Sequence, residues 1–122
     1  MDQVLALRPF VPAKDFEQSK KFYQALGFVL TLEDAQIAIL KLGSFSFILQ
    51  KFQVTEAAGN QMVQMLVRDA DAWWQRHVDG AELAAAFGVK PPSAPAMQSW
   101  GLKVGFIWDP SGVLWHVAEV PF

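Results

Sequence analysis

The chain repeats one local pattern twice, and this internal repeat limits the folds open to it. In the first half, an apolar strand-like segment is followed by Asp15 and then by the aromatic pair Phe22-Tyr23. In the second half, a similar segment is followed by Asp69 and then by Trp73-Trp74. An acidic residue placed before an amphipathic segment is typical of a helix N-cap. The pattern therefore predicts two similar modules, each of which begins with a strand and a helix.

The rest of each half reads as further strands. We expect first strands over 4–11 and 61–67, helices from Asp15, over 69–77 and over 81–87, and later strands over 28–33, 36–42, 45–52, 102–108 and 113–120. The proline-rich stretch 90–98 is expected to be extended or a loop, and the polar stretch 53–60 is expected to connect the halves. This order predicts one α+β domain over 1–122, with two βαβββ modules over 1–56 and 61–122. The strands would form a curved mixed sheet around a cleft, with the helices on the outside.

A turn and a histidine mark the end of the chain. The run Asp109-Pro110-Ser111-Gly112 has the composition of a tight turn. In the strand that follows, side chains alternate, so that Leu114, His116 and Ala118 share one face and Trp115 lies on the other. An imidazole in such a strand is either a hydrogen-bonded core residue or part of a ligand cavity.

Composition excludes several classes of function. A net charge of −2 does not provide the basic footprint that nucleic acids require. The absence of cysteine excludes disulfides and thiolate chemistry. No apolar run approaches the about 18 residues that span a bilayer, and the first residues lack the layout of a signal peptide. We expect a cytoplasmic protein without nucleic-acid or membrane partners.

Several motifs resemble the vicinal oxygen chelate superfamily, which includes glyoxalases, bleomycin-resistance proteins and extradiol dioxygenases. These motifs are Asp15 with the run from Phe22 to Phe28 (Phe-Tyr-Gln-Ala-Leu-Gly-Phe), then Asp69-Ala70-Asp71, Trp100-Gly101 and Asp109-Pro110-Ser111-Gly112. In this order they cover nearly the whole chain. The resemblance implies paired βαβββ modules that enclose a cavity, and a homodimer.

Metal-dependent members of that superfamily bind an ion through four inward positions. The resemblance matches these positions to Arg8, Gln50, Met62 and His116, with Gln61 or Gln64 as competitors of Met62. Arg8 cannot lose its proton, and a thioether and a neutral amide are poor partners for a hard divalent ion. The expectation is therefore a site without metal or other cofactor.

The closing segment is most similar to the bleomycin-resistance branch, in which a Trp-Gly pair precedes the penultimate strand. This implies that the protein binds or sequesters a small, aromatic antibiotic-like molecule and is not an enzyme. Bleomycin itself is cationic and would favour a more acidic protein than this one. The alternatives are a metal-dependent lyase or dioxygenase, a metal-free isomerase with His116 as its base, and a dimer module with a collapsed cleft. No nucleophile elbow or phosphate-binding glycine loop is present.

The expected ligand site combines a few polar groups with apolar walls, as small-molecule pockets usually do. Arg8, Gln50 and His116 would supply the polar contacts, and Met62, Trp100, Phe106 and Trp108 the apolar ones. Arg8 and Gln50 are also compatible with simple positions at a sheet edge or a solvated rim. Trp73 and Trp74 are expected to pack in the core, because they lie on a helix.

Overall fold

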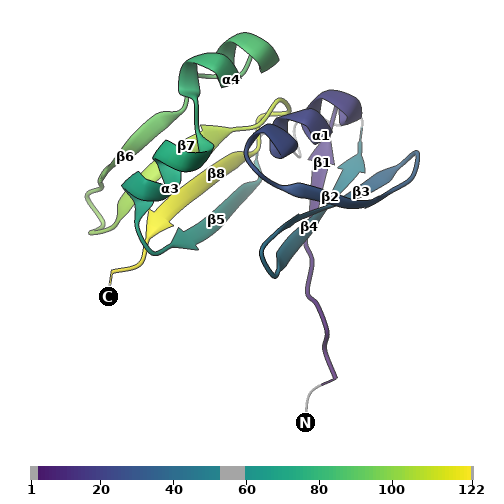
Figure 1. Cartoon of the computed structure of the whole chain (residues 1–122), viewed down its shortest axis with the longest axis horizontal. Helices are drawn as coiled ribbons and strands as arrows, with labels where there is room; N and C mark the ends of the chain where they lie inside the picture. Colours follow the sequence, from purple (N-terminus) through teal and green to yellow (C-terminus); the bar gives the residue numbers. More distant parts are fainter. Residues whose placement is uncertain (1–2, 53–59, 122) are drawn as a thin grey trace.

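The computed structural model describes residues 3–52 and 60–121. Its first half contains β1 (Phe10–Ala13), α1 (Phe16–Ala25), β2 (Val29–Glu33), β3 (Ile37–Leu42) and β4 (Phe45–Lys51). Its second half contains β5 (Met62–Val67), α3 (Ala70–His77), α4 (Gly80–Phe87), β6 (Ser93–Met97), β7 (Lys103–Trp108) and β8 (Leu114–Glu119). The two halves lie side by side (Figure 1).

The two sheets have the same topology. Their strand orders are β1-β4-β3-β2 and β5-β8-β7-β6. In each sheet the first strand runs parallel to the last, and the other pairs are antiparallel. This repeated order confirms the predicted α+β fold of two βαβββ modules. None of the helices in the described residues is long and apolar enough to cross a membrane.

Aspartates start the helices, as the sequence predicts at Asp15 and Asp69, and Asp79 does the same for α4, which begins at Gly80. The side chains of Asp15, Asp69 and Asp79 accept hydrogen bonds from the amide three residues further on, at 3.0 to 3.1 Å. Each bond satisfies one of the free amides in a first helical turn. At the other end of α4, Gly88 adopts a left-handed conformation with φ 63°, which a residue without Cβ reaches easily.

Two segments differ from the expected strands. The predicted strand from Val4 is wrong over residues 4–9, because β1 begins at Phe10. Pro9 lacks an amide proton for a ladder, and the paired register with β4 begins at Phe10, although the Pro9 carbonyl accepts from the amide of Ile48 at 2.9 Å. We call residues 3–9 the N-terminal arm. Its root lies beside β4 and its outer part extends away from the body (Figure 1). In the stretch 90–98, the residues Ser93–Met97 form the edge strand β6, where Pro95 is tolerated. Most of the expected connection, 53–59, lies outside the described residues.

Helices cover one face of each sheet. Tyr23 of α1 packs on Phe47 of β4, with ring centroids 4.9 Å apart. Trp74 of α3 lies so close to Gly105 of β7 that a Cβ there would stand 2.5 Å from the indole. Trp73 and Trp74 both pack against the core, as predicted. The ring of Trp115 lies 5.6 Å from that of Tyr23, so one aromatic core joins the modules.

The opposite face of each sheet has no helix among the described residues, and we call it the open face. The edge strands β1 and β5 approach each other where Gln61 Nε2 donates to the carbonyl of Phe10 at 3.1 Å. The two sheets are therefore joined near the start of both strands.

Candidate functional site

The open face of the second sheet carries an aromatic and amide surface. The register places Gln64, His116 and Phe106 side by side on β5, β8 and β7. One pair further along, Met62, Leu114 and Trp108 lie opposite one another. Directly opposed residues project from the same side of a sheet, so these six side chains form one continuous surface.

Three rings on this face form an aromatic bed, which consists of Phe106, Trp108 and His116. The rings of Phe106 and His116 meet edge to face, with centroids 4.9 Å apart and planes at 81°. The centroid of Trp108 lies 6.4 Å from that of Phe106. All three side chains are half-buried. Edge and face contacts of this kind fix ring orientations and present flat π-surfaces to a guest.

A lysine borders the aromatic bed. Lys90, which precedes β6, places its Nζ 4.3 Å from the centroid of the Trp108 ring. Such a contact is a cation–π interaction. The lysine is exposed, so its ammonium group remains available to other partners at the border of the bed.

His116 is the titratable group at the centre of this face. No hydrogen bond to its side chain occurs among the described residues, and its nearest neighbour in register is the amide of Gln64. A neutral imidazole offers one donor and one acceptor, and an amide offers both kinds of group. The pair can therefore hydrogen-bond a bound molecule whose ring covers the aromatic bed.

The open face of the first sheet is more polar at one end. Arg8 of the arm donates from Nε to Ser46 Oγ at 2.8 Å, and Lys41 lies opposite Ser46 in the register of β3 and β4. Gln50 lies further along β4, opposite Pro12 and Ile37. Arg8 thus belongs to a polar cluster with Ser46 and Lys41. It does not lie in the first strand, where it was expected, because β1 begins at Phe10.

The structure brings together only part of the predicted site. Met62, Phe106, Trp108 and His116 share the open face of the second sheet. Gln50 belongs to β4 of the first sheet, and Arg8 of the arm contacts a different level of that strand, at Ser46. Trp100 stands in the connection between β6 and β7 with 57% of its surface exposed.

The residues present do not fit a divalent metal centre. The four positions that would surround a metal can be located from the strand register. In the second module, His116 of β8 lies opposite Gln64 of β5, the residue named above as a competitor of Met62. The equivalent pair in the first module is Ile48 and Phe10, because Phe10 and Gln64 each precede the capping aspartate of their module by five residues. Ile48 and Phe10 have no atom that could bind a metal. Among the described residues, no three His, Asp or Glu side chains are grouped as a metal would require.

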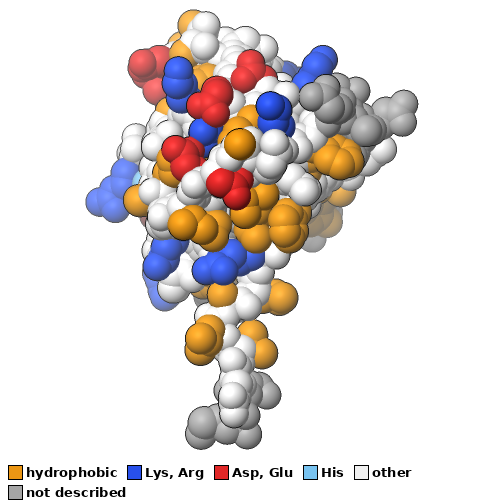
Figure 2. All heavy atoms as spheres, turned by 90° about the vertical axis from the view of Figure 1, so that its right-hand side faces the viewer, with side chains coloured by type: hydrophobic (Ala, Val, Ile, Leu, Met, Phe, Trp, Pro, Cys, Tyr) orange, Lys and Arg blue, Asp and Glu red, His pale blue; other side chains and the backbone are white. Residues whose placement is uncertain are grey.

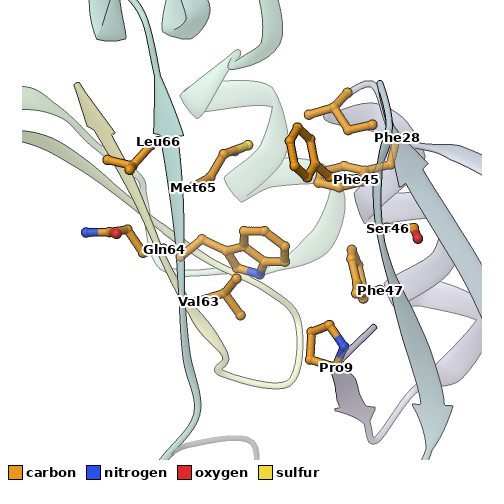
Figure 3. Close-up of a pocket in the computed structure, with 11 residues that line it drawn as sticks. Pro9, Phe28, Phe45, Ser46, Phe47, Val63, Gln64, Met65 and Leu66 are labelled. Atoms are coloured by element: carbon orange, nitrogen blue, oxygen red, sulfur yellow. The ribbon is translucent and has the colours of Figure 1, made fainter. Parts of the chain in front are cut away.

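A separate apolar pocket of about 420 Å³ lies between the modules (Figure 3). Val63 and Met65 of β5 reach into it from one side, and Phe45 and Phe47 of β4 from the other. The side chain of Gln64 points to the opposite side of β5 (Figure 3), which agrees with its position on the open face. None of the seven predicted ligand residues lines this pocket.

A buried hydrogen-bond relay adjoins the pocket through Trp115. Tyr23 donates from its hydroxyl to Asp109 Oδ2 at 2.6 Å and accepts from Trp115 Nε1 at 2.9 Å. Asp109 Oδ1 also accepts from the amides of Ser111 and Val113. Burial raises the pKa of Asp109 from 3.8, although these hydrogen bonds oppose the shift. Burial and the nearby carboxylate also raise the pKa of Tyr23 well above 10.0.

Sequence reasoning missed the pocket and the relay for the same reason. Asp109 reads as a turn residue and Tyr23 as part of an amphipathic helix, and 86 positions separate them. No local pattern indicates that they meet. The one available signal is that an aspartate in a turn followed by apolar residues requires partners if it becomes buried.

Solved structures of similar fold include bleomycin-binding proteins and a glyoxalase/bleomycin resistance protein. The bleomycin-binding protein of Streptomyces verticillus, complexed with copper(II)-bleomycin, matches with a TM-score of 0.79 and 21% identity, over 98% of this chain and 99% of that one. A bleomycin-binding protein complexed with bleomycin matches with a TM-score of 0.75 and 22% identity, over 98% and 99%. A glyoxalase/bleomycin resistance protein from Catenulispora acidiphila matches with a TM-score of 0.70 and 24% identity, over 97% and 100%.

These likenesses concern the fold, since sequence identity is low throughout. No protein-family model and no curated protein matches the chain. The structural matches nevertheless extend over the full length of both modules, and they agree with the resemblance carried by the sequence motifs. The chain therefore shares its fold with these bleomycin-binding and glyoxalase/bleomycin resistance proteins.

Proposed function

We propose that this protein binds and sequesters a small aromatic molecule on the open face of its second sheet. The observation that carries the proposal is the aromatic bed, in which Phe106, Trp108 and His116 lie together at the surface of the second sheet. Stacking of a planar ring on such a surface contributes about 0.5–1.5 kcal/mol beyond the burial of area. The shared fold with bleomycin-binding proteins supports a role of the antibiotic-resistance type.

The proposed contacts extend beyond the aromatic bed. Met62 lengthens the apolar wall, since it lies opposite Leu114 beside Trp108 and 67% of it is exposed. Gln64 and His116 would hydrogen-bond the polar edge of the ligand. Trp100, in the connection before β7, would complete the site. Arg8 and Gln50 would not take part in it, because Ser46 of the first sheet and Gln64 of the second point away from each other on opposite sides of the inter-module pocket (Figure 3).

We also propose that the site works without a metal and without catalysis. Its donor set consists of one imidazole and neutral amides, and His116 has no carboxylate neighbour in register to orient it as a base. Binding requires only complementary shape and a few polar contacts, which this surface can offer.

Tryptophan fluorescence titration with a panel of planar aromatic compounds tests this proposal. We expect saturable quenching by some members in the wild type, and at least tenfold weaker binding in Trp108→Leu, because the main stacking surface is lost. Phe45→Leu is the matched control, since Phe45 is an exposed aromatic residue of the inter-module pocket. If no compound binds, or if Phe45→Leu weakens binding and Trp108→Leu does not, the proposal is wrong.

A homodimer is the second part of the proposal. The N-terminal arm is apolar and almost fully exposed, at 98% for Leu5 and 92% for Leu7. Figure 2 shows hydrophobic side chains both along the arm and on the body above it. Exposed apolar segments of this kind are typical of interaction sites. The best-suited cover for the arm is the body of a second copy.

The inter-module pocket is a suitable receptor for the partner's arm. It is lined mainly by apolar side chains, and one of its walls is the edge strand β5. An extended segment can add to such an edge through its backbone while its side chains enter pockets. Pro9, at the root of the arm, also lines this pocket, so two arms related by a twofold axis can exchange between neighbouring subunits. We propose that this dimer acts in the cytoplasm.

A further inference from the structure

We infer that the open face of the second sheet selects an anionic aromatic ligand, such as a planar ring that carries a carboxylate. This inference refines the proposed function and rests on it. It starts from how the charges are distributed over the molecule. The net charge of −2 is an average over the whole chain and differs from the charge at the surface that a ligand would meet.

The carboxylates of the described residues are all engaged away from the open faces. They cap helices or lie in first helical turns (Asp15, Glu17, Asp69, Asp71, Asp79, Glu82), bind Lys20 (Glu33), close turns (Asp34, Asp109) or accept from the start of α3 (Glu119). Glu33 pairs with Ala38 in register, which places it on the helix-covered face. In the described parts of the chain, the negative charges thus lie at helix starts, in turns and in the core.

The full charges at the open faces are positive. Lys90 borders the aromatic bed of the second sheet through its contact with Trp108. Arg8 and Lys41 flank Ser46 on the first sheet. The salt bridges of the described residues involve only Lys20 and Lys103 as cations, so Lys90 can pair with a ligand on the aromatic bed. Arg8 and Lys41 lie on the other sheet, whose open face points away from the bed (Figure 3).

The chemistry of Lys90 favours an oxyanion next to a ring. Lys90 brings an ammonium group to the border of a stacked ring, where a carboxylate substituent would lie. A cationic ligand would instead meet a like charge beside the aromatic bed, which raises the cost of binding.

Three ligands of one shape test the inference: 2-naphthoate, 2-naphthamide and 2-naphthylmethylammonium, each titrated by calorimetry at pH 7.5 and low salt. We expect the carboxylate to bind at least about fivefold tighter than the amide, and the ammonium compound to bind most weakly, as partly exposed ion pairs allow. The preference for the carboxylate should decline as salt is added.

Variants then locate the charge preference. In Lys90→Gln, the preference of carboxylate over amide should fall below about twofold. In Lys21→Gln, which removes an exposed cation of α1, it should be unchanged. Circular dichroism checks that each variant is folded.

The outcomes separate this inference from the proposed function. If the amide or the ammonium compound binds as tightly as the carboxylate, the anionic class is wrong and the aromatic site remains. If the preference survives in Lys90→Gln, this cation does not select the ligand and the inference fails. If none of the three compounds binds, both the inference and the proposed function are overturned.

Discussion

At the scale of single residues, Tyr23 is the side chain on which the union of the two modules depends most. It belongs to α1 of the first module, yet both of its hydrogen-bond partners, Asp109 and Trp115, belong to the second. It is completely buried, and its ring packs on Phe47 and Trp115. One hydroxyl therefore satisfies a buried carboxylate and fixes the indole that lines the inter-module pocket.

Replacement of Tyr23 by phenylalanine should destabilise the protein by about 1–3 kcal/mol, because Asp109 loses a partner inside the core while the ring packing is kept. Urea denaturation monitored by circular dichroism measures the change. Ser111→Ala is the matched control, since it removes an exposed hydrogen bond between the same modules, from the amide of Lys14. It should cost less than about 1 kcal/mol. Equal effects of the two changes would contradict the importance of the buried relay.

At the scale of elements, the close approach of α3 to β7 sets how the second helix lies on its sheet. Trp74 fills the space above Gly105, where any side chain would collide with the indole. Trp74 is thereby held on the helix-covered face of the sheet. On β7 itself, Phe106 and Trp108 point to the open face. The glycine thus allows the helix to pack closely behind the aromatic bed.

Gly105→Ala should cost about 1–3 kcal/mol in stability, as overpacking of a close contact usually does. Thermal unfolding measures the change. The double variant Gly105→Ala/Trp74→Leu should recover part of the lost stability, because leucine is smaller than tryptophan and leaves room for the new Cβ. Gly80→Ala is the control, since a Cβ there meets Pro92 at an ordinary 3.6 Å. It should be neutral or slightly stabilising. A tolerated Gly105→Ala would show that α3 is not held by this contact.

The same scale shows how far the sequence alone predicts the structure. The helix starts at Asp15 and Asp69 could be predicted, because capping is a local interaction. The start of β1 could not, since an apolar run does not show whether a neighbouring strand is present to pair with it. The residue opposite His116 could not be predicted either. Met62 and Gln64 lie on the same face of β5, so alternation along the strand does not distinguish them, and only the register with β8 shows that Gln64 is the partner.

At the scale of the whole molecule, two features support the proposed dimer: the exposed arm and the apolar pocket beside an edge strand. Both lie at the junction of the modules, where β1 and β5 meet. A single chain leaves these apolar surfaces in contact with water. An exchange of arms between two copies would cover the arm and fill the pocket at the same time.

Light scattering after gel filtration at micromolar concentration tests this arrangement. The wild type should elute with twice the chain mass of 13.6 kDa. Leu5→Ser/Leu7→Ser should be monomeric, because it removes the apolar side chains that would enter the partner. Gln3→Ala, in the same arm, should remain dimeric. A monomeric wild type would contradict the proposed dimer, and a dimeric double variant would contradict the role of the arm.

The central claim of this account is that the open face of the second sheet, with its aromatic bed, is the binding surface. Indole N–H signals in ¹H–¹⁵N NMR spectra test it most directly, since Trp108 lies on that face and Trp115 lines the inter-module pocket. With signals assigned from Trp→Phe variants, addition of 2-naphthoate should shift the Trp108 signal progressively and leave that of Trp115 in place. A shift of Trp115 without a shift of Trp108 would contradict the account.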